Sequence, residues 1–246
     1  MRDILTHVAV HYWFWLLLGA FMVFCFFAIF VTATLEKYPI RQYQPGSPEE
    51  VCPPSAYFLA MNEAAQNFGF RHCGNFLQSR GSSLYRCCIS LWLSPDQRIL
   101  VIVGGGKLAK IDYKRTFFLS VAEDGKEILT VDDFGLSDLS NIREIDTVYH
   151  ASFDELNTRH MARLAMWPAP QREFSPARCL EQYEDLGKVR AETMVSLGLA
   201  KFLDLSESAY RHTLKGAWQK AYQGYIQGLE KANLQKERHG IKRPGS

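Results

Sequence analysis

The segment ILVIVGGGKLAKID, residues 99–112, carries the most recognisable candidate for chemistry in the chain. Gly104, Gly106 and Ala109 fit the pattern G-x-G-x-x-A, whose glycines let the backbone approach the pyrophosphate of a dinucleotide. That fingerprint also needs a helix after the glycines and an acidic residue roughly 20 positions further on. Glu123 follows Gly104 by 19 residues, so the literal pattern is present.

The residues GGGKLA also resemble the glycine loop of siroheme-synthase-type dehydrogenases, and this resemblance implies a dinucleotide bound on a parallel βαβ unit. The flanking residues favour another structure. TFFLSV (116–121) and EILTV (127–131) lie on either side of Asp124-Gly125, a strong hairpin signal. If a helix began at Lys107, only about ten residues would remain before the next strand, near Phe117. The crossover between two parallel strands normally needs a dozen or more. We therefore expect a wide glycine hairpin between antiparallel strands, and no cofactor.

His72, Cys73, Cys87 and Cys88 are the residue types that could ligate a metal or act as nucleophiles. Structural zinc sites usually space paired cysteines by two to four residues, so that both thiolates converge on one ion. Cys87 and Cys88 are adjacent, and adjacent side chains of a strand point to opposite faces. The spacing therefore indicates a buried cysteine and an ordinary thiol, and we expect no metal site.

Other polar residues offer little catalytic potential. The sequence contains no G-x-S-x-G, H-E-x-x-H or P-loop pattern. His160 lies on the apolar stripe of a predicted helix, where a hydrogen-bonded core histidine is the commoner structure. The carboxylate pairs Glu123-Asp124 and Asp132-Asp133 lie in turn-like stretches and are typical of solvated loops. We expect no catalytic residue among them.

The C-terminal segment gives the strongest positive signal. From 206 to 246 there are eight Lys or Arg residues against three Glu, a surplus of +5, although the whole chain carries only +2. The last predicted helix begins near Ser206, and aromatic and basic residues accompany its apolar stripe, a combination that suits a membrane interface. A helix packed on its own domain with a solvated basic face is the alternative. The predicted contact residues are Tyr210, Arg211, Lys215, Trp218, Lys220, Tyr222 and Tyr225.

An uncharged apolar segment of 23 residues, Tyr12 to Thr34, precedes the rest of the chain. A helix of that length crosses a hydrocarbon core of roughly 30 Å. A cleaved signal peptide is the alternative, but its apolar core is normally only about 7–15 residues long. We therefore predict a retained single-pass anchor in contact with the lipid bilayer.

Basic residues and cysteines indicate the side of the membrane on which the soluble part lies. Arg2 precedes the span, whereas Lys37 and Arg41 follow it, and basic residues favour the cytoplasmic side. Five cysteines follow the span, an odd number without a repeating spacing, which is typical of a reducing compartment. We expect the soluble part to face the cytoplasm.

The middle of the chain has the period of an antiparallel sheet. LYRCCISLWL (84–93) alternates core-facing and more polar positions, and the turn signal SPDQ (94–97) follows it. Helical spacing with a serine cap appears before this region, at 55–68, and after it, from the capping box SFDE (152–155) to about Trp167. We predict an α+β fold: a meander of four to five antiparallel strands flanked by helices that cover one face.

These patterns divide the chain into six parts. They are a tail at 1–11, a transmembrane helix at 12–35, a Pro-rich linker at 36–54, an α+β domain at 55–167, a second Pro-rich linker at 168–177, and a helical region at 178–246 that includes the basic amphipathic helix.

The combined patterns predict a membrane-anchored binding, assembly or accessory protein that contacts a protein partner or the membrane surface, and no nucleic acid. The charge of +5 on one helix is a thin footprint for a nucleic-acid-binding surface. The alternative is an enzyme or small-ligand sensor with a cleft between the first helix of the domain and the sheet. Its first candidates would be Gly104–Gly106, His72 and Cys73.

Overall fold

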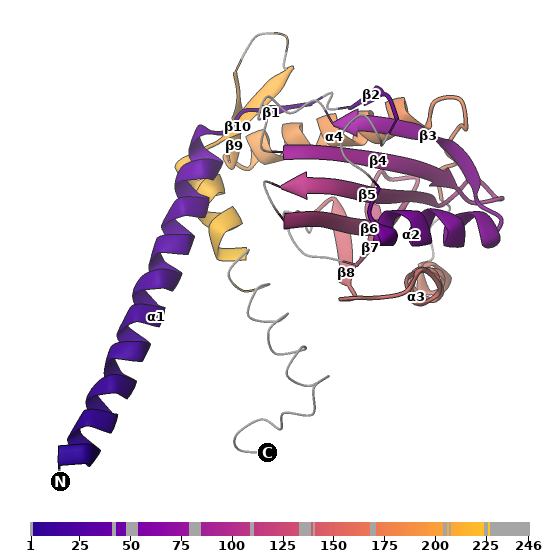
Figure 1. Ribbon diagram of the computed structural model, residues 1–246. Coiled ribbons are helices and arrows are strands. Elements are labelled where there is room, and N and C mark those ends of the chain that lie inside the picture. The colour runs from indigo at the N-terminus through magenta and orange to yellow at the C-terminus, as the bar shows by residue number, and fades with distance from the viewer. Residues whose placement is uncertain are drawn as a thin grey trace.

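The computed structural model covers the whole chain and describes most of it (Figure 1). The described residues are 2–40, 43–47, 54–78, 85–108, 111–132, 139, 141–167, 171–203, 206, 208–223 and 226.

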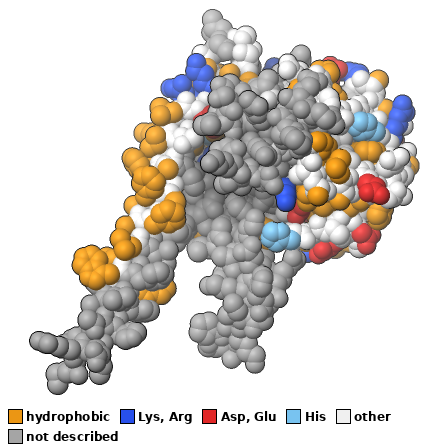
Figure 2. Space-filling model, in the orientation of Figure 1, with side chains coloured by type: hydrophobic (Ala, Val, Ile, Leu, Met, Phe, Trp, Pro, Cys, Tyr) orange, Lys and Arg blue, Asp and Glu red, His pale blue; other side chains and the backbone are white. Residues whose placement is uncertain are grey.

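The N-terminal apolar segment forms one long helix, α1 (Arg2–Leu35). Within it, Trp15–Leu35 is long and apolar enough to span a membrane. Figure 1 shows this helix projecting away from the sheet, and Figure 2 shows hydrophobic side chains gathered along it. The predicted apolar helix of membrane-spanning length is confirmed.

A mixed sheet of seven strands forms the main body. The order across the sheet is the order along the chain, and every neighbouring pair is antiparallel except β7 and β8, which run parallel. The strands are β2 (Tyr43–Pro45), β3 (Arg71–Gln78), β4 (Tyr85–Leu93), β5 (Leu100–Leu108), β6 (Ile111–Val121), β7 (Glu127–Val131) and β8 (Arg143–Thr147).

The mixed α+β class and the antiparallel meander are confirmed, but the sheet is larger than predicted. The short strands β2 and β8 extend the meander of four to five strands at its two edges. The added strand β8 runs parallel to β7, so the predicted antiparallel meander gains one parallel pair at its edge. The hairpin at Asp124-Gly125 is confirmed, with Gly125 at a φ of +88°.

Helices cover both faces of this sheet, not one as predicted. On one face, α2 (Ala56–Asn67) and α3 (Phe153–Met166) pack against β3, β5, β6 and β7. On the other, α4 (Cys179–Ser196) packs on the strands through Cys179, Tyr183 and Leu186. The reason is that the central strands are apolar on both faces. Neighbouring residues of a strand face opposite sides of the sheet, and Val101 and Ile102 of β5 are both fully buried, as is Phe118 of β6. Two apolar faces require two covering layers.

Both predicted helix starts in this domain are confirmed. The Ser55 hydroxyl caps α2 by accepting a hydrogen bond from the Phe58 amide at 3.2 Å. The Ser152 hydroxyl caps α3 by accepting one from the Glu155 amide at 3.1 Å.

The glycine run does not form the turn that we predicted. Gly104, Gly105 and Gly106 lie inside β5, opposite β4 on one side and β6 on the other. Lys107 continues the same strand, so no helix begins there. Phe58 of α2 packs directly over Gly105, because an added Cβ would lie 2.7 Å from its ring. The absence of a side chain at Gly105 therefore allows α2 to pack closely on the sheet.

Among the described residues, the region after α4 is only partly helical, which differs from the predicted helical region at 178–246, whose last part, 227–246, lies outside them. A small antiparallel sheet joins β1 (Tyr38–Pro39), β10 (Ala209–His212) and β9 (Ala200–Phe202), with β10 in the middle. A helix then occupies residues 214–223, capped by Thr213, whose hydroxyl accepts a hydrogen bond from the Gly216 amide at 3.2 Å. The strand pairing explains the difference: β10 gains partners from both ends of the chain.

Gly105→Ala tests the close approach of α2 to the sheet. The new methyl group would lie 2.7 Å from Phe58 Cδ2 and 3.1 Å from Phe58 Cβ and Cγ, atoms near the backbone of α2 that cannot easily move away. We therefore expect a loss of unfolding free energy of about 1–3 kcal/mol. Urea unfolding in detergent micelles measures it. Combining Gly105→Ala with Phe58→Leu should recover part of the loss relative to the sum of the single variants. Purely additive losses would contradict the proposed contact.

Candidate functional site

The residues that could bind a metal lie on different faces of the sheet. His72 is exposed, with Nε2 at 3.1 Å from the Ser90 hydroxyl and its ring against Trp92 at 4.7 Å. Cys88 is buried against the α2 side, and its thiol donates to the Gly105 carbonyl at 3.4 Å. Cys73, an extra residue at an irregularity in β3, packs instead on the α4 side. Among the described residues, no three His, Cys, Asp or Glu side chains are grouped so that they could hold a metal ion.

The side chain of His160 is buried on the core-facing side of α3, as its position on the apolar stripe of the helix predicted. It is fully buried, with Nε2 at 3.1 Å from the Ser120 hydroxyl and Nδ1 at 3.0 Å from the Thr130 hydroxyl. Burial, with a smaller contribution from Arg163, lowers the pKa of His160 to about 3. A neutral imidazole that bridges two hydroxyls is a structural group of the core.

The carboxylate pairs differ in their surroundings. Glu123 and Asp124 are exposed at the β6–β7 turn, as expected for solvated loop charges. Asp132 was wrongly placed in that class: it is half-buried, accepts a hydrogen bond from the Ala151 amide at 3.2 Å and another from the Tyr57 hydroxyl. Asp132 thus connects α2, the end of β7 and the start of α3. Asp133 lies outside the described residues.

A buried cluster of charged residues that the sequence did not predict lies between α4 and the sheet. Glu127 is 2% exposed and accepts hydrogen bonds from Arg143 Nε at 2.9 Å and from Arg190 Nε at 2.7 Å. The Arg190 guanidinium also lies over the Tyr183 ring, 5.6 Å from its centroid. Burial, with Arg190 nearby, lowers the pKa of Arg143. The cluster joins α4 to β7 and β8, and no local sequence signal brings these three residues together.

Of the predicted contact residues, Tyr210, Trp218 and Lys220 contact α1 or the strand β1 that follows it, and two of the set are not helical. Tyr210 and Arg211 lie on β10 instead of on the predicted helix. The Tyr210 ring stacks on Tyr38 of β1, with centroids 5.3 Å apart. Lys215, Trp218, Lys220 and Tyr222 lie on helix 214–223, and Tyr225 lies outside the described residues.

Trp218 brings helix 214–223 against α1. Its ring lies edge-on to Phe26 at 5.0 Å and to Phe30 at 6.4 Å between centroids. Both phenylalanines belong to the segment of α1 that could span a membrane. The predicted amphipathic helix and the predicted anchor, which are almost 200 residues apart in the sequence, therefore lie side by side.

Lys220 connects the same two ends of the chain at a second point. Its ammonium donates to the Tyr38 hydroxyl at 2.7 Å and lies 4.5 Å from the centroid of that ring. The Tyr38 hydroxyl in turn donates to Glu36 at 2.5 Å, and its ring also contacts His212 at 5.1 Å. Burial and the positive charge of Lys220 lower the pKa of His212 to about 4.

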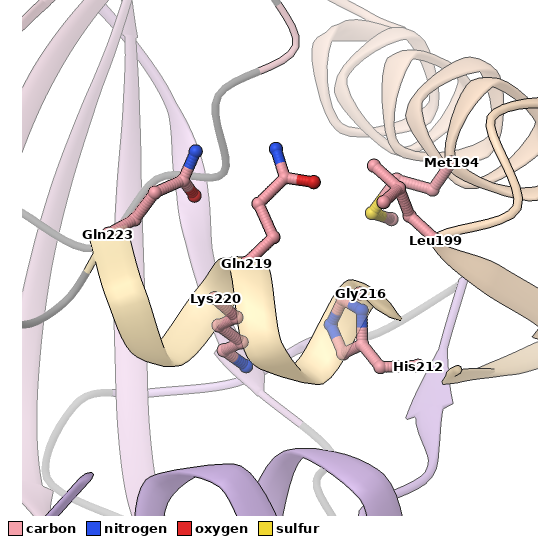
Figure 3. A pocket seen from close by; sticks show the side chains of 7 residues that line it. All are labelled: Met194, Leu199, His212, Gly216, Gln219, Lys220 and Gln223. Atoms are coloured by element: carbon pink, nitrogen blue, oxygen red, sulfur yellow. The ribbon is translucent and has the colours of Figure 1, made fainter. Parts of the chain in front are cut away.

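A small pocket lies between helix 214–223 and the end of α4 (Figure 3). Gln219 and Gln223 extend from the helix on one side, whereas Lys220 leaves it on another. The pocket is lined by Met194, Leu199, His212, Gly216, Gln219, Lys220 and Gln223. His212, the histidine among the described lining residues, contacts the Tyr38 and Tyr210 rings and lies near the positive charge of Lys220.

Comparison with the models of known protein families, with curated proteins and with solved structures found no match.

Protonation of buried His160 should make the fold less stable in acid. The folded pKa is about 3 and the unfolded pKa about 6.5, so the stabilisation is complete above pH 6.5 and is lost as the pH falls towards 3. Between pH 7 and 5 we expect the unfolding free energy to fall by about 2 kcal/mol from this group. Urea unfolding of the full chain in detergent micelles measures the slope.

His160→Gln is the control for that slope, because it removes the titration but keeps a polar group near Ser120 and Thr130. His212 acts in the same direction in both proteins, so the difference between them isolates His160. Equal slopes in the two proteins would contradict the buried neutral histidine.

Gly216→Ala should detach helix 214–223 from the domain. An added Cβ would lie 1.8 Å from the backbone oxygen of Leu199, which cannot move as a side chain can. Overpacking of this kind costs about 1–3 kcal/mol or more, so we expect faster amide hydrogen exchange across 214–223, measured by mass spectrometry. Gly187→Ala on α4, where an added Cβ would lie 3.9 Å from the nearest atom, should leave the exchange unchanged. Equal protection in both variants would show that the helix is not seated there.

Proposed function

We propose that this chain is a membrane-anchored binding, assembly or accessory protein. Helix α1 crosses the bilayer, and the residues beside it contact a protein partner of a membrane complex or the membrane surface. This juxtamembrane surface consists of Tyr210, Arg211, Lys215, Trp218, Lys220, Tyr222 and Tyr225. No catalytic residue, cofactor or nucleic acid enters the proposal.

The contact of Trp218 with Phe26 carries the proposal. It brings helix 214–223 beside α1, which is, among the described residues, the helix long and apolar enough to span a membrane. Trp218 remains 59% exposed and Tyr222 54% exposed in spite of that contact. Large exposed aromatic side chains next to a lysine suit a membrane interface or a partner surface.

The packing of the sheet favours a binding role over the alternative of an enzyme or ligand sensor. That alternative needs an open cleft between α2 and the sheet, lined by polar groups. Phe58, Met61 and Ala65 of α2 are instead buried against the strands, and Phe58 covers Gly105. The residues named first for that alternative, His72 and Cys73, do not share a face of the sheet.

We further propose that the soluble part faces the cytoplasm. Lys37 and Arg41 follow the span, and basic residues next to a span favour that side. Five cysteines follow the span, an odd number without a repeating spacing, which is typical of a reducing compartment.

Charge reversal at the juxtamembrane surface tests the binding role. The full chain carrying Lys215→Glu is purified from its native membranes in mild detergent, and the proteins that accompany it are identified by mass spectrometry. Since Lys215 is exposed beside Trp218, we expect the reversal to weaken capture of an acidic partner or of anionic lipid severalfold. An alkaline wash of the membranes should release neither the wild-type chain nor the variant.

Arg71→Glu on β3 is the matched control, because it reverses an exposed positive charge of the large sheet, outside the juxtamembrane surface. It should leave the captured proteins and lipids unchanged. Identical capture by both variants would remove Lys215 from the binding surface. Release of the wild-type chain by the alkaline wash would refute the anchor itself.

A further inference from the structure

Helix 214–223 exposes its large apolar side chains, whereas a helix on a water-soluble domain usually packs them against the domain. Leu214, Trp218 and Tyr222 lie four residues apart and form one outward stripe, which we call the outer face. Their side chains are 71%, 59% and 54% exposed. On a helix in water, this stripe would be the side that packs on the domain.

The side that does pack on the domain is made of small residues. Gly216 is seated against the Leu199 backbone, and Ala217 and Ala221 are completely buried. Small residues on the contact side with large apolar residues on the outside are the pattern by which helices associate in lipid.

The longer polar side chains of the helix also turn towards protein. Gln219 and Gln223 line the pocket with Met194 and Leu199, as Figure 3 shows. Lys220 reaches Tyr38, and Lys215 donates to the Leu197 carbonyl at 3.1 Å. Each of these polar groups therefore has protein atoms beside it, while the outer face is apolar and aromatic.

The depth of the helix along α1 gives an independent argument. Trp218 contacts Phe26, which is adjacent to the midpoint, Cys25, of the segment Trp15–Leu35. Phe26 lies nine residues before Leu35, which is about 13 Å along a helix. If α1 spans the bilayer, the Trp218 ring lies well inside the apolar layer rather than at its surface.

We infer that helix 214–223 lies within the same bilayer as α1, with its outer face against lipid acyl chains. The inference rests on the proposed anchoring by α1 and adds a second membrane contact to it. Burial of Leu214, Trp218 and Tyr222 in lipid removes from water the apolar surface that the structure leaves uncovered.

The two lysines fit this position because their charged ends point back towards the domain. Lys220 extends to Tyr38, which follows the apolar segment of α1 by three residues, and Lys215 extends to the loop after α4. A lysine can place its stem in apolar surroundings while its ammonium reaches the polar interface. The outer face thus enters lipid without burying an uncompensated charge.

Photo-crosslinking of the full chain in vesicles tests this assignment. The chain is reconstituted in phosphatidylcholine with phosphatidylglycerol after Leu214→benzoylphenylalanine, Trp218→benzoylphenylalanine or Tyr222→benzoylphenylalanine, one at a time. Illumination followed by mass spectrometry then identifies lipid adducts. Val23, 70% exposed on α1, serves as the reference for the anchor. Leu59 on α2 and Met166 on α3, 56% and 77% exposed, serve as references for the water-facing domain.

We expect acyl-chain adducts on the outer face at a level comparable with that at Val23 and well above that at Leu59 and Met166. Adducts at Val23 without adducts on the outer face would overturn the inference and leave the anchor standing. Adducts from a second protein chain at Trp218 or Tyr222 would overturn it in favour of a protein contact. An absence of adducts at Val23 would refute the anchor, and the inference with it.

Discussion

The antiparallel pairing of β1 with β10 controls how the apolar helix α1 is arranged against the C-terminal part of the domain. It sets Tyr38, three residues beyond the apolar segment of α1, opposite Tyr210 near the other end of the chain. Stacking of those two rings and the reach of Lys220 to Tyr38 reinforce a pairing of only two residues. Without it, nothing in the local sequence would bring helix 214–223 against Phe26 and Phe30. Because the pairing is so short, the aromatic contacts around it must supply much of its stability.

The sheet imposes a second constraint, because both of its faces are apolar. One face is covered by α2 and α3, which flank the meander in the sequence. The other is covered by α4, which follows a second proline-rich segment. The buried cluster of Glu127, Arg143 and Arg190 joins α4 to the sheet edge. Removal of one partner of such a cluster usually destabilises a protein strongly, since the remaining charges stay buried. The cluster therefore specifies where α4 sits as much as it stabilises the fold.

The glycine run shows how a motif can be present without its function. Gly104–Gly106 satisfy the spacing of a dinucleotide loop, but the strands on both sides pair with them along their whole length. Backbone amides that are used in a sheet ladder cannot cradle a pyrophosphate. The glycines instead allow an aromatic ring of α2 to lie on the sheet, a close approach that only a residue without a side chain permits at Gly105.

The local patterns determined the apolar N-terminal helix, the caps at Ser55 and Ser152, the hairpin at Asp124-Gly125 and the buried position of His160, because each depends on residues close in the sequence. The sequence did not determine the edge strands β2 and β8, since their pairing depends on partners at a distance rather than on their own period. For the same reason Tyr210 and Arg211 appeared helical, although two flanking strands hold them extended. Only the tertiary structure decided that α4 covers a second face and that the apolar side of helix 214–223 points outward beside α1. Periodicity identifies an apolar stripe on a helix, but residues far along the chain decide whether that stripe packs against protein or faces outward.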